Sequence, residues 1–338
     1  MILHAASKVY GAAASWRRRW YTRDPSRRRR LERPVVSIGN LSVGGSGKTP
    51  VVAHVAALLA ARGERPAILS RGYGRTAPRN GVTIVSDGSA VLAPLEQAGD
   101  EPLMLARALP GIPVLVAADR YAAGRTAEQR LGTTVHVLDD GFQHLMLARD
   151  VDLLLAEPDN LSDQVLPAGC LREPVGAAAS ADALLIPGGS PASDEYLKRA
   201  LGVAVTFRVC RSIGQPRWLE SGLPADVRSD DVVLAVAGIA RPERFFADLS
   251  AANLPLAATE TFRDHHPYTD ADVDRIVRAR DKAGATLVIT TEKDAVRLSA
   301  RPLRGLRVAV VPLTATIEPP SFVDWLLTKM RARAGSGS

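Results

Sequence analysis

Short apolar runs alternate along this chain with longer segments in which apolar residues recur every three or four positions. A run from Pro34 breaks into a glycine-rich stretch, after which Val52, Val55, Ala56 and Leu59 fall on one helical face. Continuous apolar strands that alternate with helices predict an α/β fold with a mostly parallel sheet flanked by helices. Further elements are expected as strands at Pro66–Ser70, Val82–Ser86, Pro113–Ala117, Thr134–Leu138, Val151–Ala156 and Ala183–Pro187, and as helices at Asp100–Leu109 and Asp119–Leu131.

A second, smaller α/β unit is predicted downstream. Between residues 208 and 230 the periodicity is weak, which favours a linker or a small hairpin. The alternation resumes with strands at Val232–Gly238, Leu256–Phe262, Thr286–Thr290 and Val308–Val311, and with helices from Pro242, Thr269 and Ser321. The expected organisation is an N-terminal arm (1–33), a first domain (34–207), a linker or hairpin (208–230), a smaller domain that completes a cleft (231–333) and a disordered tail (334–338).

The N-terminal arm combines an apolar stripe with a strong positive charge. The stripe has helical spacing and consists of Ile2, Ala5, Val9, Ala13, Trp16 and Trp20. Residues 1–33 hold ten Lys and Arg against two Asp and Glu, whereas the whole chain has a net charge of +7, so the remainder is nearly neutral. An amphipathic helix with interfacial tryptophans and a basic end suits an anionic membrane surface. Two alternatives stay open: the helix packs on the body with a solvated basic tail, or Arg17–Arg30 bind nucleic acid.

Composition narrows the class of protein. A chain of 338 residues, 46% hydrophobic and 23% charged, is typical of a globular protein with two domains. Cys170 and Cys210 have no metal-type spacing and predict no disulfide framework, as expected for a reducing cytoplasm. No apolar run approaches the roughly 20 residues that span a bilayer. A secretory signal is not indicated, because the arginines of the arm follow its apolar part.

The glycine-rich stretch has the pattern of a phosphate-binding loop. It ends in Gly47-Lys48-Thr49 between a predicted strand and a predicted helix, which is the P-loop NTPase arrangement. In such a loop the backbone N–H groups hold phosphate, the lysine reaches the β- and γ-phosphates, and the hydroxyl binds Mg²⁺. Ser42 stands where the motif usually has its first glycine. The residues expected to bind ATP are Ser42, Val43, Gly44, Gly45, Ser46, Gly47, Lys48 and Thr49.

Acidic residues and histidines supply the remaining candidate chemistry. Asp139 and Asp140 follow an apolar strand, where carboxylates hold Mg²⁺ directly or through water, although Asp139-Asp140-Gly141 can also be only a turn. Asp100 begins a predicted helix and can be merely its N-cap. In Asp264–Pro267, a histidine paired with a carboxylate is a simpler interpretation than a zinc site, since adjacent histidines rarely bind one ion.

Several short motifs follow one another between residue 34 and about 300. The motifs are Gly39–Pro50 (GNLSVGGSGKTP), Ser70–Arg75 (SRGYGR), Gly99–Pro102 (GDEP), Asp139–His144 (DDGFQH), Leu166–Pro174 (LPAGCLREP), Ala237–Phe246 (AGIARPERFF), Asp264–Pro267 (DHHP) and Thr291–Val296 (TEKDAV). Taken in this order, they resemble the tetraacyldisaccharide 4′-kinase family, the lipid A kinases of Gram-negative bacteria. The family shares the Ser42 departure, because it has a small hydroxyl residue there.

The resemblance implies a reaction and roles for particular residues. ATP with Mg²⁺ would phosphorylate the 4′-hydroxyl of a tetraacylated glucosamine disaccharide 1-phosphate, giving lipid IVA. Asp100 would be the catalytic base, His265 its partner, Lys48 the phosphate-binding cation, and Asp139 and Asp140 would serve Mg²⁺ and catalysis. Thr49, Asp139 and Glu173 are the expected magnesium ligands. The enzyme would be cytoplasmic and peripheral on the inner membrane through its basic helix, with neither nucleic acid nor an obligate protein partner.

Two other classes of function share some of these features. A P-loop switch or assembly NTPase would use Lys48, Thr49 and Asp139, but it would need neither a base at Asp100 nor a membrane anchor. A nucleic-acid-binding protein would use the Arg17–Arg30 arm. Formation of a phosphorylated lipid separates the kinase from the switch NTPase, and retention on anionic liposomes but not on DNA separates it from the nucleic-acid-binding protein.

Overall fold

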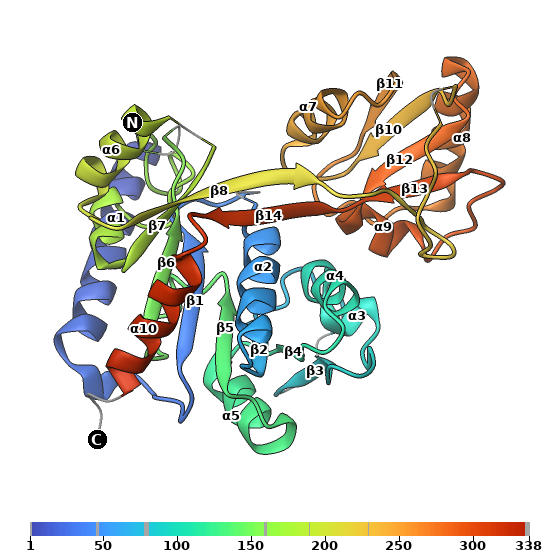
Figure 1. Ribbon diagram of the computed structural model, residues 1–338. Helices are drawn as coiled ribbons and strands as arrows, with labels where there is room; N and C mark the ends of the chain where they lie inside the picture. The colour runs from blue at the N-terminus through green and yellow to red at the C-terminus, as the bar shows by residue number, and fades with distance from the viewer. Residues whose placement is uncertain are drawn as a thin grey trace.

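The computed structural model describes residues 2–44, 47–77, 81–158, 161–188, 190–228 and 230–334. Within them the chain forms two β-sheets, each with helices on both faces (Figure 1). The larger sheet has nine strands in the order β14-β8-β7-β6-β1-β5-β2-β4-β3. Its strands are β1 (Val35–Asn40), β2 (Pro66–Ser70), β3 (Thr83–Ser86), β4 (Val114–Val116), β5 (Val135–Asp139), β6 (Val151–Leu155), β7 (Ala183–Pro187), β8 (Thr206–Ile213) and β14 (Leu313–Glu318).

The larger sheet is parallel except at its edges, where β3 runs antiparallel to β4 and β14 antiparallel to β8. One face is covered by α2 (Lys48–Ala61), α3 (Leu95–Ala98), α4 (Asp100–Ala108) and α10 (Phe322–Ala334), and the other by α5 (Arg120–Leu131), η3 (Val175–Ser180) and α6 (Pro191–Leu201).

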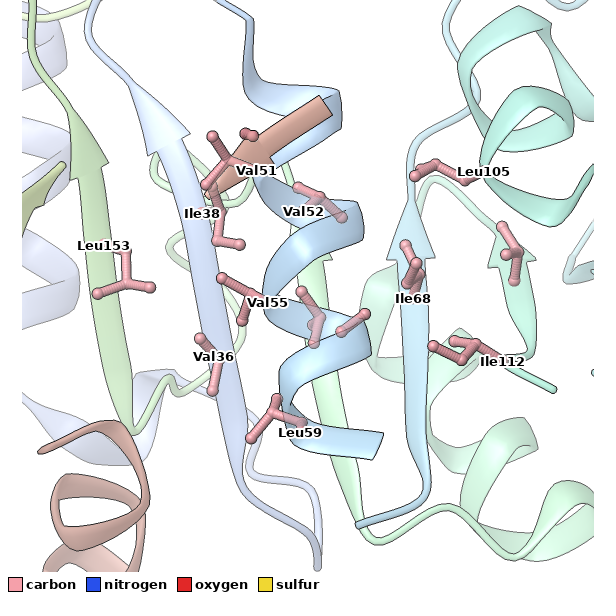
Figure 2. Packing of buried hydrophobic residues seen from close by; sticks show 14 of the residues in the cluster. Val36, Ile38, Val51, Val52, Val55, Leu59, Ile68, Leu105, Ile112 and Leu153 are labelled. Carbon is pink, nitrogen blue, oxygen red and sulfur yellow. The ribbon is translucent and has the colours of Figure 1, made fainter. Parts of the chain in front are cut away.

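Side chains of β1 alternate between the two faces of this sheet. Val36 and Ile38 pack with Val55 and Leu59 of α2 (Figure 2), whereas Val35 packs on the side of α5. Each such fully buried aliphatic side chain contributes roughly 1.5–3 kcal/mol of hydrophobic stabilisation. Because β1 is buried on both faces, it fixes the starting position of the loop at its carboxyl end.

The smaller sheet has the order β11-β10-β12-β13-β9, with only β9 antiparallel to its neighbour. Helix α8 packs on one face through Val273 and Ile276, and α7 on the other through Phe245 and Leu249. The elements of this unit are β9 (Arg217–Trp218), β10 (Val233–Ala237), α7 (Pro242–Ala251), β11 (Leu256–Thr261), α8 (Asp270–Ala283), β12 (Leu287–Thr291), α9 (Glu292–Leu298) and β13 (Val308–Val311). The expected fold class, a P-loop-type parallel sheet with a second α/β unit, is confirmed.

Strands β8 and β14 run side by side between the two units (Figure 1). The predicted linker or hairpin at 208–230 therefore begins inside a long strand of the larger sheet, and β14 was not predicted. Helix α10, expected in the smaller unit, packs on the larger core through Phe322, Leu326 and Met330. The boundary expected at 231–333 thus differs from the observed one, because β14 returns the chain to the first sheet. Residues 335–338 of the expected disordered tail lie outside the described residues.

The N-terminal arm forms α1 (Ile2–Arg23) and a short 3₁₀ turn, η1 (Pro25–Arg27). Ala5, Val9, Ala13, Trp16 and Trp20 of the predicted stripe are all exposed, and only Ser7, Gly11 and Arg18 of this helix are buried among the side chains described. None of the described helices is both long and apolar enough to cross a membrane.

Candidate active site

The phosphate loop joins the carboxyl end of β1 to α2. The N-cap of α2 is Gly47, with φ of 70°, and Gly44 has φ of 100°. Glycine adopts these left-handed conformations without the steric cost of a Cβ. Lys48 and Thr49 are the first residues of the helix, whose N-terminal N–H groups form a site suited to an anion. Gly45 and Ser46, also expected to bind ATP, lie outside the described residues.

Lys48 lies in a polar cluster at this end of the sheet. Its Nζ donates to Oδ1 of Asn40 at 2.9 Å and lies 3.5 Å from Oδ1 of Asp140. Arg172 donates two hydrogen bonds, of 2.7 and 2.8 Å, to the same Asp140 carboxylate and others to Asn40. Burial alone would raise the pKa of Asp140, but the bonds from Arg172 and the charge of Lys48 hold that pKa well below its usual range. Asp140 is therefore a stable counter-ion for both cations.

Asp139 ends β5 beside this cluster and accepts a 3.0 Å hydrogen bond from the Ser70 hydroxyl. Burial raises the pKa of Asp139 to about 7, and the neighbouring charges of Glu101 and Asp140 act in the same direction. The charge of Lys48 and the bond from Ser70 lower the pKa of Asp139, but they do not offset these effects. An added cation would favour the ionised form of Asp139.

Asp100 meets His265 where the two units face each other. The N-cap of α4 is Gly99, so the alternative that Asp100 merely caps its helix is wrong. The buried Asp100 carboxylate instead lies 2.8 Å from Nδ1 of His265 and accepts a 2.7 Å hydrogen bond from Nε of Arg297 of α9, whose Nη2 forms an ion pair with it at 2.5 Å. Burial would raise the pKa of Asp100, but these hydrogen bonds and the charge of Arg297 lower it. Asp100 is therefore ionised at neutral pH.

The other ring nitrogen of His265 lies 3.1 Å from Nζ of Lys293, which also donates to Asp264 at 2.9 Å. Since an ammonium can only donate, we assign Nε2 of His265 as an acceptor and Nδ1 as the protonated nitrogen that donates to Asp100. His266 turns away and pairs with Asp272 at 3.0 Å. The two adjacent histidines therefore have separate carboxylate partners.

The phosphate loop and His265 line the same cleft, which has a volume of about 560 Å³. The predicted residues that line it are Ser42, Val43, Gly44, Gly47, Lys48, Thr49, Asp139, Asp140 and His265. Asp100 lies behind His265, with 1% of its surface exposed. Across the described residues, no cluster of three or more His, Cys, Asp or Glu side chains is arranged to hold a metal ion.

Glu173 is not brought to the phosphate side of this cleft. Its carboxylate is 3% exposed and accepts hydrogen bonds of 2.5 and 2.9 Å from Arg18 of α1, one on each oxygen. This arrangement does not fit the expectation that Glu173 is a magnesium ligand, because both oxygens already have a cationic partner.

Sequence reasoning assigned no role to Asn40, Arg172, Lys293 or Arg297, which the structure places in direct contact with predicted site residues. The first three lie within the quoted motifs, and Arg297 directly follows one of them. Their position in or next to a motif could have marked these residues as candidates for the site. It could not have shown which side chain each contacts, because that depends on tertiary contacts.

A phosphate loop with a lysine and paired aspartates, facing an Asp–His pair across a cleft, defines a P-loop phosphotransferase. Comparison with known proteins gives the particular family. The family model described as tetraacyldisaccharide-1-P 4′-kinase matches residues 1–331. The chain belongs to the tetraacyldisaccharide 4′-kinase family, as its motifs predict.

Individual relatives match this sequence over most of its length. The tetraacyldisaccharide 4′-kinase of Geobacter metallireducens is 44% identical over 306 residues, 88% of each chain. That of Koribacter versatilis is 42% identical over 98% of this chain and 100% of its own. A crystal structure of LpxK from Aquifex aeolicus in complex with ATP matches with a TM-score of 0.79 and 31% identity, covering 96% of this chain and 97% of that one.

Proposed function

We propose that this protein transfers the γ-phosphoryl group of ATP to the 4′-hydroxyl of a tetraacylated glucosamine disaccharide 1-phosphate, giving lipid IVA. The observation that carries the proposal is the placement of His265, backed by Asp100, in the same cleft as Lys48. A switch NTPase needs the phosphate loop but has no use for a carboxylate–imidazole pair at an acceptor position.

The donor half of the cleft would hold ATP. The loop from Ser42 to Thr49 would bind the phosphates through backbone N–H groups and the positive end of α2, and Lys48 would neutralise the β- and γ-phosphates. Asp140, held by Arg172, would restrain the position of the Lys48 ammonium, which lies 3.5 Å from it. Positioning and charge neutralisation are the main contributions that a protein makes to phosphoryl transfer.

Magnesium fits the donor half. Asp139 ends β5 and lines the cleft together with Thr49, so a carboxylate and a hydroxyl, both oxygen ligands that Mg²⁺ takes, belong to its wall. We propose that Thr49 and Asp139 hold Mg²⁺ together with the ATP phosphates, with Asp140 close by. Bound there, the ion would neutralise charge on the transferred group.

The acceptor half would deprotonate the 4′-hydroxyl. As the acceptor oxygen bonds to the γ-phosphorus, the bond to the bridging oxygen breaks, and ADP leaves with that electron pair. We propose that the hydroxyl proton passes to Nε2 of His265, which lines the cleft, and that ionised Asp100 behind it is the base of the pair, accepting the bond from Nδ1. Lys293 can give up its bond to His265 because it retains Asp264.

The exposed stripe of α1 would dock on the membrane that holds the acyl chains. Val9 is 71% and Trp16 is 67% exposed, and both lie on the same helix face as exposed Trp20. Arginines of the same helix would contact anionic headgroups. We propose that the enzyme is peripheral on the cytoplasmic face of the inner membrane.

The test is to incubate the protein with Mg²⁺-ATP and the acylated disaccharide 1-phosphate and to analyse the lipid by mass spectrometry. We expect one added phosphate at the 4′ position, lost in Lys48→Met and when a chelator removes Mg²⁺. ATP hydrolysis that neither needs the acceptor nor yields a phosphorylated lipid would contradict the proposal and favour a switch NTPase.

A further inference from the structure

The buried face of α1 carries a charged residue. Arg18 is 7% exposed, although its sequence neighbours Arg17 and Arg19 are exposed. Its guanidinium bonds both oxygens of Glu173 and also donates to the carbonyl of Phe142 at 3.0 Å and to the hydroxyl of Ser180 at 2.8 Å. A buried ion pair with this many hydrogen bonds fixes the geometry of the segments that it joins.

One of these segments is bonded directly to the phosphate loop. The backbone N–H of Arg172 donates to the carbonyl of Leu41 at 2.7 Å, and that of Val43 donates to the carbonyl of Cys170 at 2.8 Å. The segment that precedes Glu173 therefore forms a short antiparallel pairing with the first half of the loop. Glu173, bonded to Arg18, is the next residue along this segment.

The other segment carries Asp140. Arg18 holds the Phe142 carbonyl and lies 4.4 Å above the Phe142 ring. Phe142 in turn packs against Gly39 so closely that a Cβ there would lie 2.5 Å from the Cβ of Phe142. Asp140, two residues before Phe142, bonds Arg172 in the first segment. The two segments held by Arg18 thus meet again at the counter-ion of Lys48.

We propose that Arg18 is a positioning residue for the phosphoryl-donor site, and that Glu173 acts through Arg18 rather than as a ligand of Mg²⁺. The helix with the exposed apolar stripe then has two separable tasks. Its outer face contacts the membrane, and its inner face holds the phosphate loop and Asp140 in place through one guanidinium. The inference rests on the proposed function in taking ATP as the donor and the membrane as the partner of the outer face.

The test uses a paired substitution, Arg18→Met with Glu173→Gln, which removes both charges and leaves no unpaired buried ion. The matched control is Arg149→Met with Asp152→Asn, another buried pair of an arginine and a carboxylate in the same unit, which lies outside the cleft. Each protein is assayed for KM of ATP, KM of the acceptor in detergent micelles, retention on anionic vesicles and thermal unfolding.

We expect the Arg18 pair variant to raise the KM of ATP by about tenfold or more. Displacing a positioned group by about 1 Å can change a kinetic constant by at least this factor. The KM of the acceptor and vesicle retention should stay near wild type, as should all values of the control variant. Arg18→Lys, which keeps the buried charge, should lie between the two. A folded pair variant with unchanged KM for ATP would overturn the inference, as would equal increases in both KM values.

Should the pair variant not fold, Arg18→Lys decides by the same two KM values. Failure of the proposed function is distinguishable, because it would show as absence of a lipid product in the wild-type protein. If the wild-type protein made the expected product and the variants kept its KM for ATP, the proposed role of Arg18 would be refuted and the proposed function would stand.

Discussion

At the scale of single residues, backbone strain marks both halves of the site. Non-glycine residues with positive φ among those described are Asp140, Asn253, His265 and Arg304. For such residues the left-handed region has an energetic cost that surrounding contacts must offset. At Asp140, with φ of 54°, Arg172 and Lys48 provide those contacts, and at His265, with φ of 57°, Asp100 and Lys293 do. The conformations aim these two side chains at their partners.

Gly39 allows a close approach of backbone that a larger residue would prevent. A Cβ at this position would lie 2.5 Å from the Cβ and 2.8 Å from the amide nitrogen of Phe142, so the chain would have to move. We predict that Gly39→Ala lowers the free energy of unfolding by about 1–3 kcal/mol and reduces turnover, since Phe142 adjoins the Asp140 segment. Urea denaturation measures the first effect.

Gly176→Ala is the matched control, because a Cβ at Gly176 would meet no atom within 4 Å. It should leave both the unfolding free energy and turnover near wild type. If Gly39→Ala were as stable and active as Gly176→Ala, the tight contact between Gly39 and Phe142 would contribute to neither stability nor turnover.

At the scale of elements, α1 shows what residue patterns can and cannot predict. The spacing of Val9, Trp16 and Trp20 predicts a helical stripe, and these residues do share an exposed face. The inner face was not predictable, because Arg18 stands in a run of three arginines that resembles a solvated tail. Its burial depends on Glu173, 155 residues away in sequence. Short-range periodicity carries no information about such a partner.

The exposed face of α1 gives a prediction for membrane binding. Val9→Glu combined with Trp16→Glu should abolish most retention on anionic vesicles, because it replaces exposed apolar area by charge. Turnover of acceptor in detergent micelles should change little, since neither residue contacts the cleft. Flotation of vesicles measures retention.

Leu223→Glu, a single apolar-to-glutamate change at a residue of the smaller unit that is 63% exposed, is the control and should float with the vesicles as wild type does. Full retention of the α1 variant would instead mean that this helix only packs on the body.

At the scale of the whole molecule, the site depends on contacts between the two units. Asp100 of α4 is bonded to His265 and to Arg297 of α9, and Glu157 of the larger unit pairs with Arg241 and Arg244 at 2.8 and 2.9 Å. Strands β8 and β14 connect the same units (Figure 1). The acceptor half of the cleft therefore exists only when the units are assembled.

The parallel sheet, the loop and the family could be predicted from sequence because each has a local signature: buried strands of β-branched residues, Gly47-Lys48-Thr49, and ordered motifs. The path of β14 and the location of Glu173 could not. Strand order and side-chain partners are set by contacts between residues far apart in the chain, as between β8 and β14. The family resemblance therefore assigned Glu173 to the metal, and its pairing with Arg18 was not predicted.

The most direct test of the account is Asp100→Asn, a change that keeps the size of the side chain and removes its charge. If Asp100 is the base on the acceptor side and takes no part in holding ATP, the Kd of ATP should stay within about twofold of wild type while kcat for lipid phosphorylation falls by about 100-fold or more. Calorimetry gives the first value and a discontinuous lipid-product assay the second. Unchanged kcat in a folded variant would contradict the account, as would a loss of ATP binding that matches the loss of turnover.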